Sequence, residues 1–149
     1  MNREEIIKMI DYSSSKDVQN EGVRLALQEE DLDFVMYHSF NQIYADNCVK
    51  IFTSLPYDKC QRYFDDLFSW IEDLNRTGAQ EILEYLSKAP AERIFKSFGV
   101  ALEASIKRKS RSMMYGLLLI LRENNQLEVL VKNNNKLAIY LSEIKKETL

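Results

Sequence analysis

Residues 57–86 read YDKCQRYFDDLFSWIEDLNRTGAQEILEYL and hold two amphipathic patterns in succession. The first pattern spaces its apolar residues at steps of three and four: Cys60, Tyr63, Phe64, Leu67, Phe68, Ile71 and Leu74. The second pattern repeats that spacing with Ala79, Ile82, Leu83 and Leu86. Such a period is typical of α-helices with one apolar face. Only the polar break Asn75-Arg76-Thr77 separates the two patterns, so we expect two helices that pack antiparallel.

A helix pair of this kind needs neighbours on both sides to bury its apolar faces. Stacked pairs build helical-repeat solenoids, which mostly present a surface to another macromolecule. Similar patterns predict helices at residues 2–12, 17–28, 45–54, 91–107 and 112–123. The period is blurred over residues 31–44, where we expect a short helix and an irregular link. The sequence therefore predicts an all-α fold of about eight or nine helices.

Three local features add detail to this prediction. Gly22 lies in the apolar row of its helix, where glycine costs about 1 kcal/mol relative to Ala, and this indicates close approach of a neighbouring helix. Thr77 and Gln80 have the spacing of a capping box, so Thr77 is expected to cap the helix that follows the break. Residues 126–146 are compatible with helices or with a β-hairpin; helices are favoured because an isolated hairpin would have no sheet to join.

Length and composition favour one domain over residues 1–149. The chain is 46% hydrophobic and 29% charged, which is ordinary for a soluble globular protein. With 4 Gly and 2 Pro it has too few turn residues for a β-sandwich or barrel. The longest apolar run, Met113 to Leu121, is far shorter than the roughly 20 residues of a membrane span. Since the chain also lacks a signal-peptide pattern, we expect a cytoplasmic protein that does not bind membranes.

The sequence offers no residue set for catalysis, for a cofactor or for a metal ion. His38 is the only histidine, and no Ser, Cys or carboxylate lies near it at a useful helical spacing. Cys48 and Cys60 both fall at apolar helical positions, as expected of reduced thiols in a core. Paired Cys-x-x-Cys motifs, glycine-rich phosphate loops and nucleophile elbows are absent from the sequence. We therefore predict a protein that is not an enzyme.

Charge is distributed unevenly along the chain. Residues 1–75 contain 7 Lys/Arg and 15 Asp/Glu, a net charge of −8, while residues 76–149 contain 13 and 8, a net charge of +5. These values agree with the net charge of −3 for the whole chain. In a solenoid, sequence order follows the long axis, so this asymmetry predicts an acidic end and a basic end.

Several segments resemble a family of small bacterial HEAT-like proteins. Residues 70–75, Trp-Ile-Glu-Asp-Leu-Asn, followed by Gly78-Ala79, are similar to the family's core Trp-Leu-Gln-Asp-x-Asn-Trp-Pro-Gly-Ala. Residues 18–26, VQNEGVRLA, resemble its Val-Gln-Lys-Glu-Gly-Ile-x-Leu-Ala segment, and Asp46-Asn47-Cys48 resembles its Asn-Cys-Ala helix. The likeness covers about residues 15–88, and Arg76-Thr77 stands here in place of the family's Trp-Pro.

The resemblance implies a HEAT-like α-α superhelix of antiparallel helix pairs. It also implies a functional class, because relatives of this type occur as immunity proteins beside polymorphic toxins. An immunity protein binds its cognate toxin and covers the toxin's working surface. A nuclease toxin has a positively charged cleft, which an acidic protein would enter rapidly and in a salt-dependent manner.

The acidic concentrations and one aromatic residue are the candidate partner-binding residues. They are Glu29, Glu30, Asp31, Asp33, Asp65, Asp66, Glu72 and Trp70. The alternative is that the acids belong to solvated helix faces and helix ends, and that Trp70 packs in the core. A basic run, Lys107-Arg108-Lys109-Ser110-Arg111, is a candidate for phosphate contacts, or else it ends a helix where cations suit the helix dipole.

Three functions are compatible with these features. We favour a non-catalytic binding module that neutralises a cognate protein such as a basic toxin domain. The second is a general helical-repeat adaptor in a cytoplasmic assembly. The third, a HEAT-like nucleic-acid-binding protein, is less favoured because the basic run has no interleaved aromatic residues and no wider basic face. The oligomeric state is open at this stage.

Overall fold

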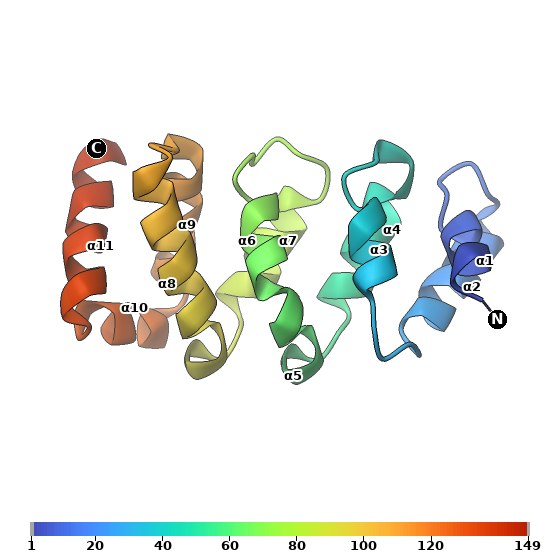
Figure 1. Cartoon of the computed structure of the whole chain (residues 1–149), viewed down its shortest axis with the longest axis horizontal. Coiled ribbons are helices and arrows are strands. Elements are labelled where there is room, and N and C mark those ends of the chain that lie inside the picture. The colour runs from blue at the N-terminus through green and yellow to red at the C-terminus, as the bar shows by residue number, and fades with distance from the viewer. Residues whose placement is uncertain (1, 149) are drawn as a thin grey trace. The chain divides into compact units, whose positions relative to one another are not determined.

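A computed structural model describes residues 2–148, and within that range all regular structure is helical, with no strand. The predicted all-α class is confirmed. The described residues form α-helices α1 to α11 and one 3-10 turn, η1 (Figure 1). This is more segments than the eight or nine expected, because some predicted helices are interrupted. The chain divides into two compact units: unit 1 extends to Pro56, and unit 2 begins at Tyr57.

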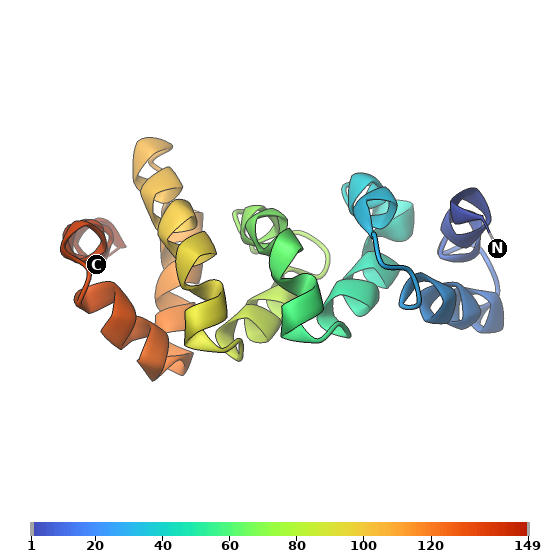
Figure 2. The ribbon, with the colours of Figure 1, turned by 60° about the horizontal axis from the view of Figure 1, so that its bottom comes forward.

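Unit 1 contains two antiparallel helix pairs. Its helices are α1 (Arg3–Met9), α2 (Lys16–Ala26), α3 (Asp33–His38) and α4 (Gln42–Thr53). Helix α1 packs on α2, and α4 contacts both α2 and α3 (Figure 2). Asn2, Ser15 and Asn41 each accept a backbone N–H and so cap α1, α2 and α4. The core of the unit is fully buried and contains Ile6, Ile10, Leu32, Val35, Cys48, Ile51 and Phe52.

Gly22 lies where α2 crosses α1, and the predicted close approach is confirmed. A Cβ atom added at this position would lie 2.8 Å from Cβ of Met9 and 2.9 Å from Cγ2 of Ile10. Real side chains do not approach so closely, and Met9 Cβ is fixed to its backbone. Only glycine therefore fits at this helix crossing.

The buried side-chain amide of Asn47 connects three segments of unit 1. The side-chain Nδ2 of Asn47 donates to the carbonyl of Ile10 at 2.8 Å and to Oε1 of Gln19 at 3.0 Å. Gln19 in turn donates to the carbonyl of Tyr12 at 3.0 Å. The Tyr12 backbone N–H donates to the carbonyl of Ile43 at 2.9 Å. These bonds join α4 to the connection between α1 and α2, and they satisfy the carbonyl that ends α1.

Unit 2 contains the stretch that predicted the fold. Its elements are α5 (Tyr57–Cys60), η1 (Gln61–Tyr63), α6 (Phe64–Trp70), α7 (Ala79–Ser87), α8 (Ala91–Lys107), α9 (Arg111–Glu123), α10 (Asn125–Lys132) and α11 (Asn135–Thr148). The long helix α8 contacts α6, α9, α10 and α11, while α7 contacts α6 and α9. Phe64, Leu67 and Phe98 are completely or almost completely buried, and Leu83 is 8% exposed. The two predicted stripes therefore face the core.

The first of the two predicted helices is interrupted and shorter than expected. The turn η1 separates α5 from α6, and α6 ends at Trp70 with Ile71 as its C-cap. Asp73 therefore lies beyond the helix, where its Oδ1 accepts the N–H of Asn75 at 2.9 Å. This local bond stabilises a turn instead of another helical turn.

The predicted capping box at Thr77 is wrong. The N-cap of α7 is Gly78, which adopts φ 82° in the left-handed region. Trp70 explains the difference, because its indole Nε1 donates to the carbonyl of Thr77 at 2.9 Å. The bond holds the Thr77 backbone against the end of α6, and the chain then turns into α7 through a conformation that favours glycine.

Residues 126–146 are helical, so the β-hairpin alternative is wrong. Asn124 caps α10 by accepting the N–H of Leu127 at 3.1 Å. Its Nδ2 also donates to the carbonyls of Ser87 and Ala89, at 3.1 and 2.9 Å. One side chain thus begins α10 and satisfies two carbonyls at the end of α7.

Candidate protein-binding surface

The two most exposed aromatic side chains of the described chain lie on helix α3 and directly after it. Tyr37 is 82% exposed and Phe40 is 76% exposed. Glu30 and Asp33 are exposed as well; Asp33 and Tyr37 lie four residues apart on one side of α3, while Glu30 precedes the helix and Phe40 follows it. We call these four residues the α3 face. On the opposite side Val35 is fully buried and fixes the helix to α4.

The rings beside the α3 face are held in defined positions. His38 Nδ1 lies 2.8 Å from the carbonyl of Phe34. Because a carbonyl can only accept, this nitrogen carries the hydrogen. The His38 ring centroid lies 5.3 Å from the rings of both Tyr37 and Tyr44, with interplanar angles of 77° and 86°. Both are edge-to-face contacts typical of aromatic pairs, and the one between His38 and Tyr44 links α3 to α4.

A hollow of about 310 Å³ adjoins these rings within unit 1. It is lined by Arg3, Glu4, Ile7, Lys8, Phe34, His38 and Tyr44. The guanidinium of Arg3 lies 5.2 Å from the centroid of the Phe34 ring, within cation–π range. The hollow, named here the α1–α3 hollow, therefore has an aromatic lining and a charged rim supplied mainly by α1.

The predicted acidic residues belong to two different units. Glu29, Glu30, Asp31 and Asp33 lie in unit 1, and Glu30 and Asp33 are the exposed members. Asp31 also has a local role, since its Oδ1 accepts the N–H of Asp33 at 2.8 Å. Asp65 and Asp66 lie in unit 2, exposed in the first turn of α6, where carboxylates suit the helix dipole.

Glu72 makes a contact inside unit 2. Its Oε2 lies 3.1 Å from Nη1 of Arg108, and its backbone carbonyl accepts a hydrogen bond from Oγ of Ser112. The two contacts join the loop after α6 to the end of α8 and to the first turn of α9. As a partner-binding residue Glu72 is therefore less suitable than Asp65 or Asp66, because a partner's cation would have to compete with Arg108.

Trp70 is not a surface residue, and its prediction as a partner-binding residue is wrong. Its side chain is 1% exposed. The guanidinium of Arg76 lies 3.9 Å from its ring centroid and covers it further. The indole is held inside by its bond to the Thr77 carbonyl, which agrees with the core-packing alternative.

Two of the four cations in the basic run between α8 and α9 contact acids. Lys107 lies 3.5 Å from Glu103, and Arg108 pairs with Glu72. Lys109 has φ 53° and is the one non-glycine residue with positive φ in the described chain. It ends α8, since the N–H of Ser110 returns to the carbonyl of Ser105 at 3.0 Å.

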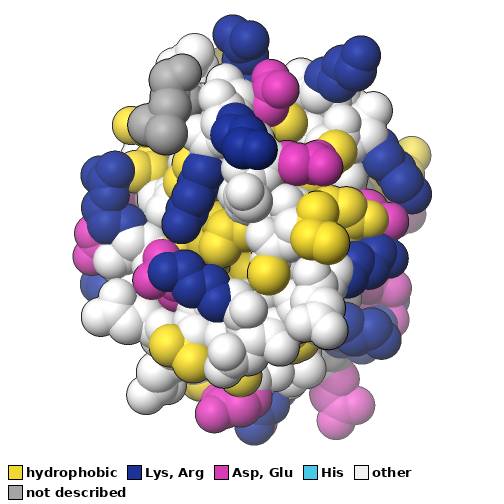
Figure 3. All heavy atoms as spheres, turned by 90° about the vertical axis from the view of Figure 1, so that its left-hand side faces the viewer, with side chains coloured by type: hydrophobic (Ala, Val, Ile, Leu, Met, Phe, Trp, Pro, Cys, Tyr) yellow, Lys and Arg dark blue, Asp and Glu magenta, His cyan; other side chains and the backbone are white. Residues whose placement is uncertain are grey.

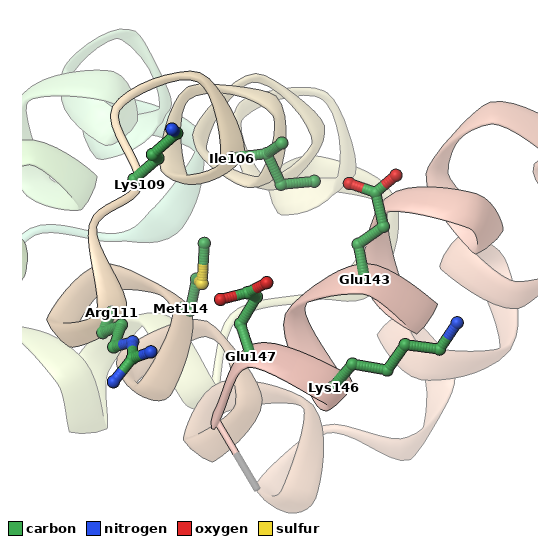
Figure 4. Close-up of a pocket in the computed structure, with 7 residues that line it drawn as sticks. All are labelled: Ile106, Lys109, Arg111, Met114, Glu143, Lys146 and Glu147. Carbon is green, nitrogen blue, oxygen red and sulfur yellow. The ribbon is translucent and has the colours of Figure 1, made fainter.

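A second hollow, of about 470 Å³, lies beside this run in unit 2. It is lined by Ile106, Lys109, Arg111, Met114, Glu143, Lys146 and Glu147. Ile106, Met114 and the carboxylate of Glu147 point into the hollow, whereas Lys146 points away (Figure 4). On the face of unit 2 seen in Figure 3, cationic and anionic side chains are interspersed around apolar ones. Such mixed charge is unlike a phosphate-binding surface.

The two cysteines are buried free thiols, as predicted. Burial raises the pKa of the Cys60 thiol to about 11, although a hydrogen bond with Tyr85 partly opposes the shift. The same burial, together with Cys60, raises the pKa of the Tyr85 hydroxyl. Tyr57 packs against Tyr85 with a centroid distance of 4.5 Å and donates to its carbonyl at 2.9 Å. Cys60 therefore remains a protonated core residue at neutral pH.

Tyr37 and Phe40 were missed as candidate site residues in the sequence. The available signal was the blurred period of residues 31–44, which contains more apolar residues than one face of a short helix can bury. Helix α3 has only six residues, and Val35 is the one that is buried, while Phe34 and Met36 are partly exposed on either side of it. The remaining aromatic side chains must lie outside.

No group of three or more His, Cys, Asp or Glu side chains that could hold a metal ion occurs within residues 2–148. Over the same range, every helix is too short or too polar to cross a bilayer. The chain matches no protein-family model, and no curated protein or solved structure is significantly similar to it. The resemblance to HEAT-like immunity proteins therefore stays a prediction.

Proposed function

We propose that this protein is a non-catalytic binding module that recognises a cognate protein through the α3 face. The observation that supports the proposal is the exposure of two aromatic side chains, Tyr37 on α3 at 82% and Phe40 just after α3 at 76%. Tyrosine and phenylalanine are enriched at protein interfaces, because they bury a large area with few rotatable bonds. Burial of an aromatic side chain of this size contributes roughly 1.5–3 kcal/mol.

The charge of the α3 face indicates the type of partner. Glu30 and Asp33 are exposed and precede the aromatic residues in the chain, and Asp33 lies on the same side of α3 as Tyr37. Unit 1 has 5 Lys/Arg and 10 Asp/Glu, a net charge of −5. A partner with a basic working surface would be attracted over distances up to the Debye length, about 8 Å at physiological salt.

Neutralisation of a toxin is the form of this function that we favour. The proposal rests on the sequence resemblance to HEAT-like immunity proteins and on the acidic, aromatic character of the α3 face. The protein would act in the cytoplasm, where it would cover the working surface of a basic toxin domain. Occlusion of that surface requires no chemistry from the immunity protein itself.

The test is capture of the partner from the native host. Tagged wild-type protein is used as bait, and the bound proteins are identified by mass spectrometry. The double variant Tyr37→Ala/Phe40→Ala should lose the partner. Tyr115→Ala is the matched control, because Tyr115 is 51% exposed on α9 in unit 2. Equal recovery of the same partner by wild type and the double variant would contradict the proposal.

A general adaptor remains the second candidate, because the α3 face would serve it equally well. Co-expression separates the two functions. If the captured protein is toxic alone and harmless together with this chain, immunity is supported. If it is harmless alone, the adaptor is supported. Nucleic-acid binding is less favoured, since Lys107 and Arg108 both contact carboxylates, and a gel-shift assay at moderate salt tests it directly.

A further inference from the structure

The α1–α3 hollow has an aromatic lining, unlike the hollow beside the basic run. Phe34, His38 and Tyr44 supply rings, and Ile7, only 8% exposed, supplies an aliphatic contact. At about 310 Å³ it is at the lower end of the range for small-ligand pockets, about 300–1,000 Å³. It therefore has room for one apolar side chain together with the backbone that carries it.

The rim carries two cations that lack an acidic partner in the described chain. Within residues 2–148 neither the guanidinium of Arg3 nor the ammonium of Lys8 forms an ion pair. Glu4 is the single carboxylate among the lining residues. The rim thus has an excess of positive charge, in contrast to the acidic α3 face beside it. Charge complementarity favours a carboxylate at this edge.

His38 supplies one polar atom to the lining. Its Nδ1 is occupied by the Phe34 carbonyl, and its Nε2 has no hydrogen-bond partner among residues 2–148. In the neutral ring with hydrogen on Nδ1, Nε2 accepts a hydrogen bond. A backbone N–H of a bound peptide segment is a donor of the right kind.

We infer that the α1–α3 hollow takes an apolar side chain from a protein partner in which an adjacent residue carries a carboxylate. The apolar side chain packs among Phe34, Tyr44 and Ile7, while the carboxylate pairs with Arg3 or Lys8. The inference rests on the proposed function, since it specifies what part of the partner the neighbouring surface receives. A free small molecule is less suitable, because it would fill the hollow and leave Tyr37 and Phe40 uncovered. Tyr37 is in ring contact with His38 at 5.3 Å, so a polypeptide can cover both sites at once.

Peptide display tests the inference without knowledge of the natural partner. Random 12-residue peptides on phage are selected against the immobilised full chain. We expect enrichment of Leu, Ile, Met or Phe next to Asp or Glu. The best peptide is then synthesised, and its dissociation constant is measured by fluorescence anisotropy. Selection that yields no peptide, or peptides without an acidic residue beside an apolar one, overturns the inference.

Charge reversal provides the second measurement. The double variant Arg3→Glu/Lys8→Glu should bind the acidic peptide at least about tenfold more weakly, since it loses a charge-assisted hydrogen bond to the carboxylate and repels it instead. It should also bind a peptide with Lys in place of the acid more tightly than wild type does. Lys16→Glu is the control, because Lys16 is exposed on α2 and does not line the hollow. Unchanged affinity of both peptides for the double variant contradicts the inference.

The two proposals fail in distinguishable ways. If captured partner and selected peptides depend on Tyr37 and Phe40 but not on Arg3 and Lys8, the α3 face is correct and the hollow is not the binding site. If the peptides depend on Arg3 and Lys8 while the natural partner ignores Tyr37 and Phe40, the hollow binds peptides and the proposed function is wrong.

Discussion

Arg108 and Glu72 are 36 residues apart in the sequence, and their side chains form an ion pair of 3.1 Å. Both side chains are more than one-third exposed, at 59% and 36%. Exposed pairs of this kind typically contribute less than about 1 kcal/mol. Their position is more informative than their strength, because the pair removes Glu72 and Arg108 from the charges that a partner would meet.

The first prediction concerns this pair. Arg108→Ala and Glu72→Gln should each lower the free energy of unfolding by less than about 1 kcal/mol, and the double variant should cost about the same as either alone. Urea unfolding followed by circular dichroism measures all three changes. Neither variant should alter the association rate of the captured partner. Asp65→Asn is measured for comparison. A slower association of the partner with Glu72→Gln would contradict the prediction and show that Glu72 belongs to the binding surface.

The second prediction concerns Gly22. Gly22→Ala should lower the free energy of unfolding by about 1–3 kcal/mol, because its Cβ would lie 2.8 Å from Met9 Cβ and force α1 and α2 apart. Gly116→Ala is the control: its Cβ would meet Ile71 Cδ1 at an ordinary 3.5 Å. That variant should gain up to about 1 kcal/mol from helix propensity. Equal effects of the two substitutions in urea unfolding would mean that α1 and α2 are not so close at Gly22.

The third prediction compares two residues with positive φ. Gly78 has φ 82° and Lys109 has φ 53°. Gly78→Ala should therefore lower the free energy of unfolding by about 1–2 kcal/mol, while Lys109→Gly should raise it by about 0.5–1 kcal/mol. The two substitutions are expected to change the free energy of unfolding in opposite directions. Thermal unfolding of both variants measures these changes. A stabilised Gly78→Ala variant would show that the start of α7 does not use the left-handed conformation.

The fourth prediction concerns Cys60. Its pKa is raised to about 11, so in native protein at pH 8 the thiol should react with a disulfide reagent far more slowly than in urea-unfolded protein. A raised pKa also links stability to pH. Unfolded protein loses the thiol proton near pH 9 and folded protein near 11, so stability is intact below 9 and falls between 9 and 11. The fall is at most about 1.4 kcal/mol per pH unit.

The control for this prediction is Cys60→Ser. The serine variant should show a smaller loss of stability between pH 9 and 11, although the raised pKa of Tyr85 leaves part of the loss in place at the upper end. Rapid modification of both thiols in native wild-type protein at pH 8 would contradict the prediction, because it would show that Cys48 and Cys60 are accessible to the reagent.

Much of the fold could be predicted because helical period reports directly on burial. Phe64, Leu67 and Leu83 were expected in the core from spacing alone, and each is buried. The close approach of a neighbouring helix at Gly22 could be predicted because glycine in a helix interior lowers the stability of the helix. The β-hairpin alternative could only be excluded by tertiary contacts, since α10 and α11 are fixed by packing on α8.

The wrong predictions have physical causes that the spacing of apolar residues does not describe. The capping box at Thr77 failed because a residue seven positions earlier, Trp70, binds its carbonyl. Trp70 was a candidate for the surface, yet its side chain is buried and the guanidinium of Arg76 lies over its ring. The α3 face was missed because a period describes which residues are buried, and exposed aromatic residues such as Tyr37 have no period of their own.

The most direct test of the account is the dissociation constant of the captured partner for wild type, for Tyr37→Ala/Phe40→Ala and for Tyr115→Ala, measured by calorimetry at one salt concentration. Because central aromatic contacts contribute at least about 2 kcal/mol when truncated, the double variant should bind at least about 30-fold more weakly. Tyr115→Ala should bind like wild type. Equal affinity of all three proteins, each shown to be folded by circular dichroism, would contradict the assignment of the α3 face as the binding surface.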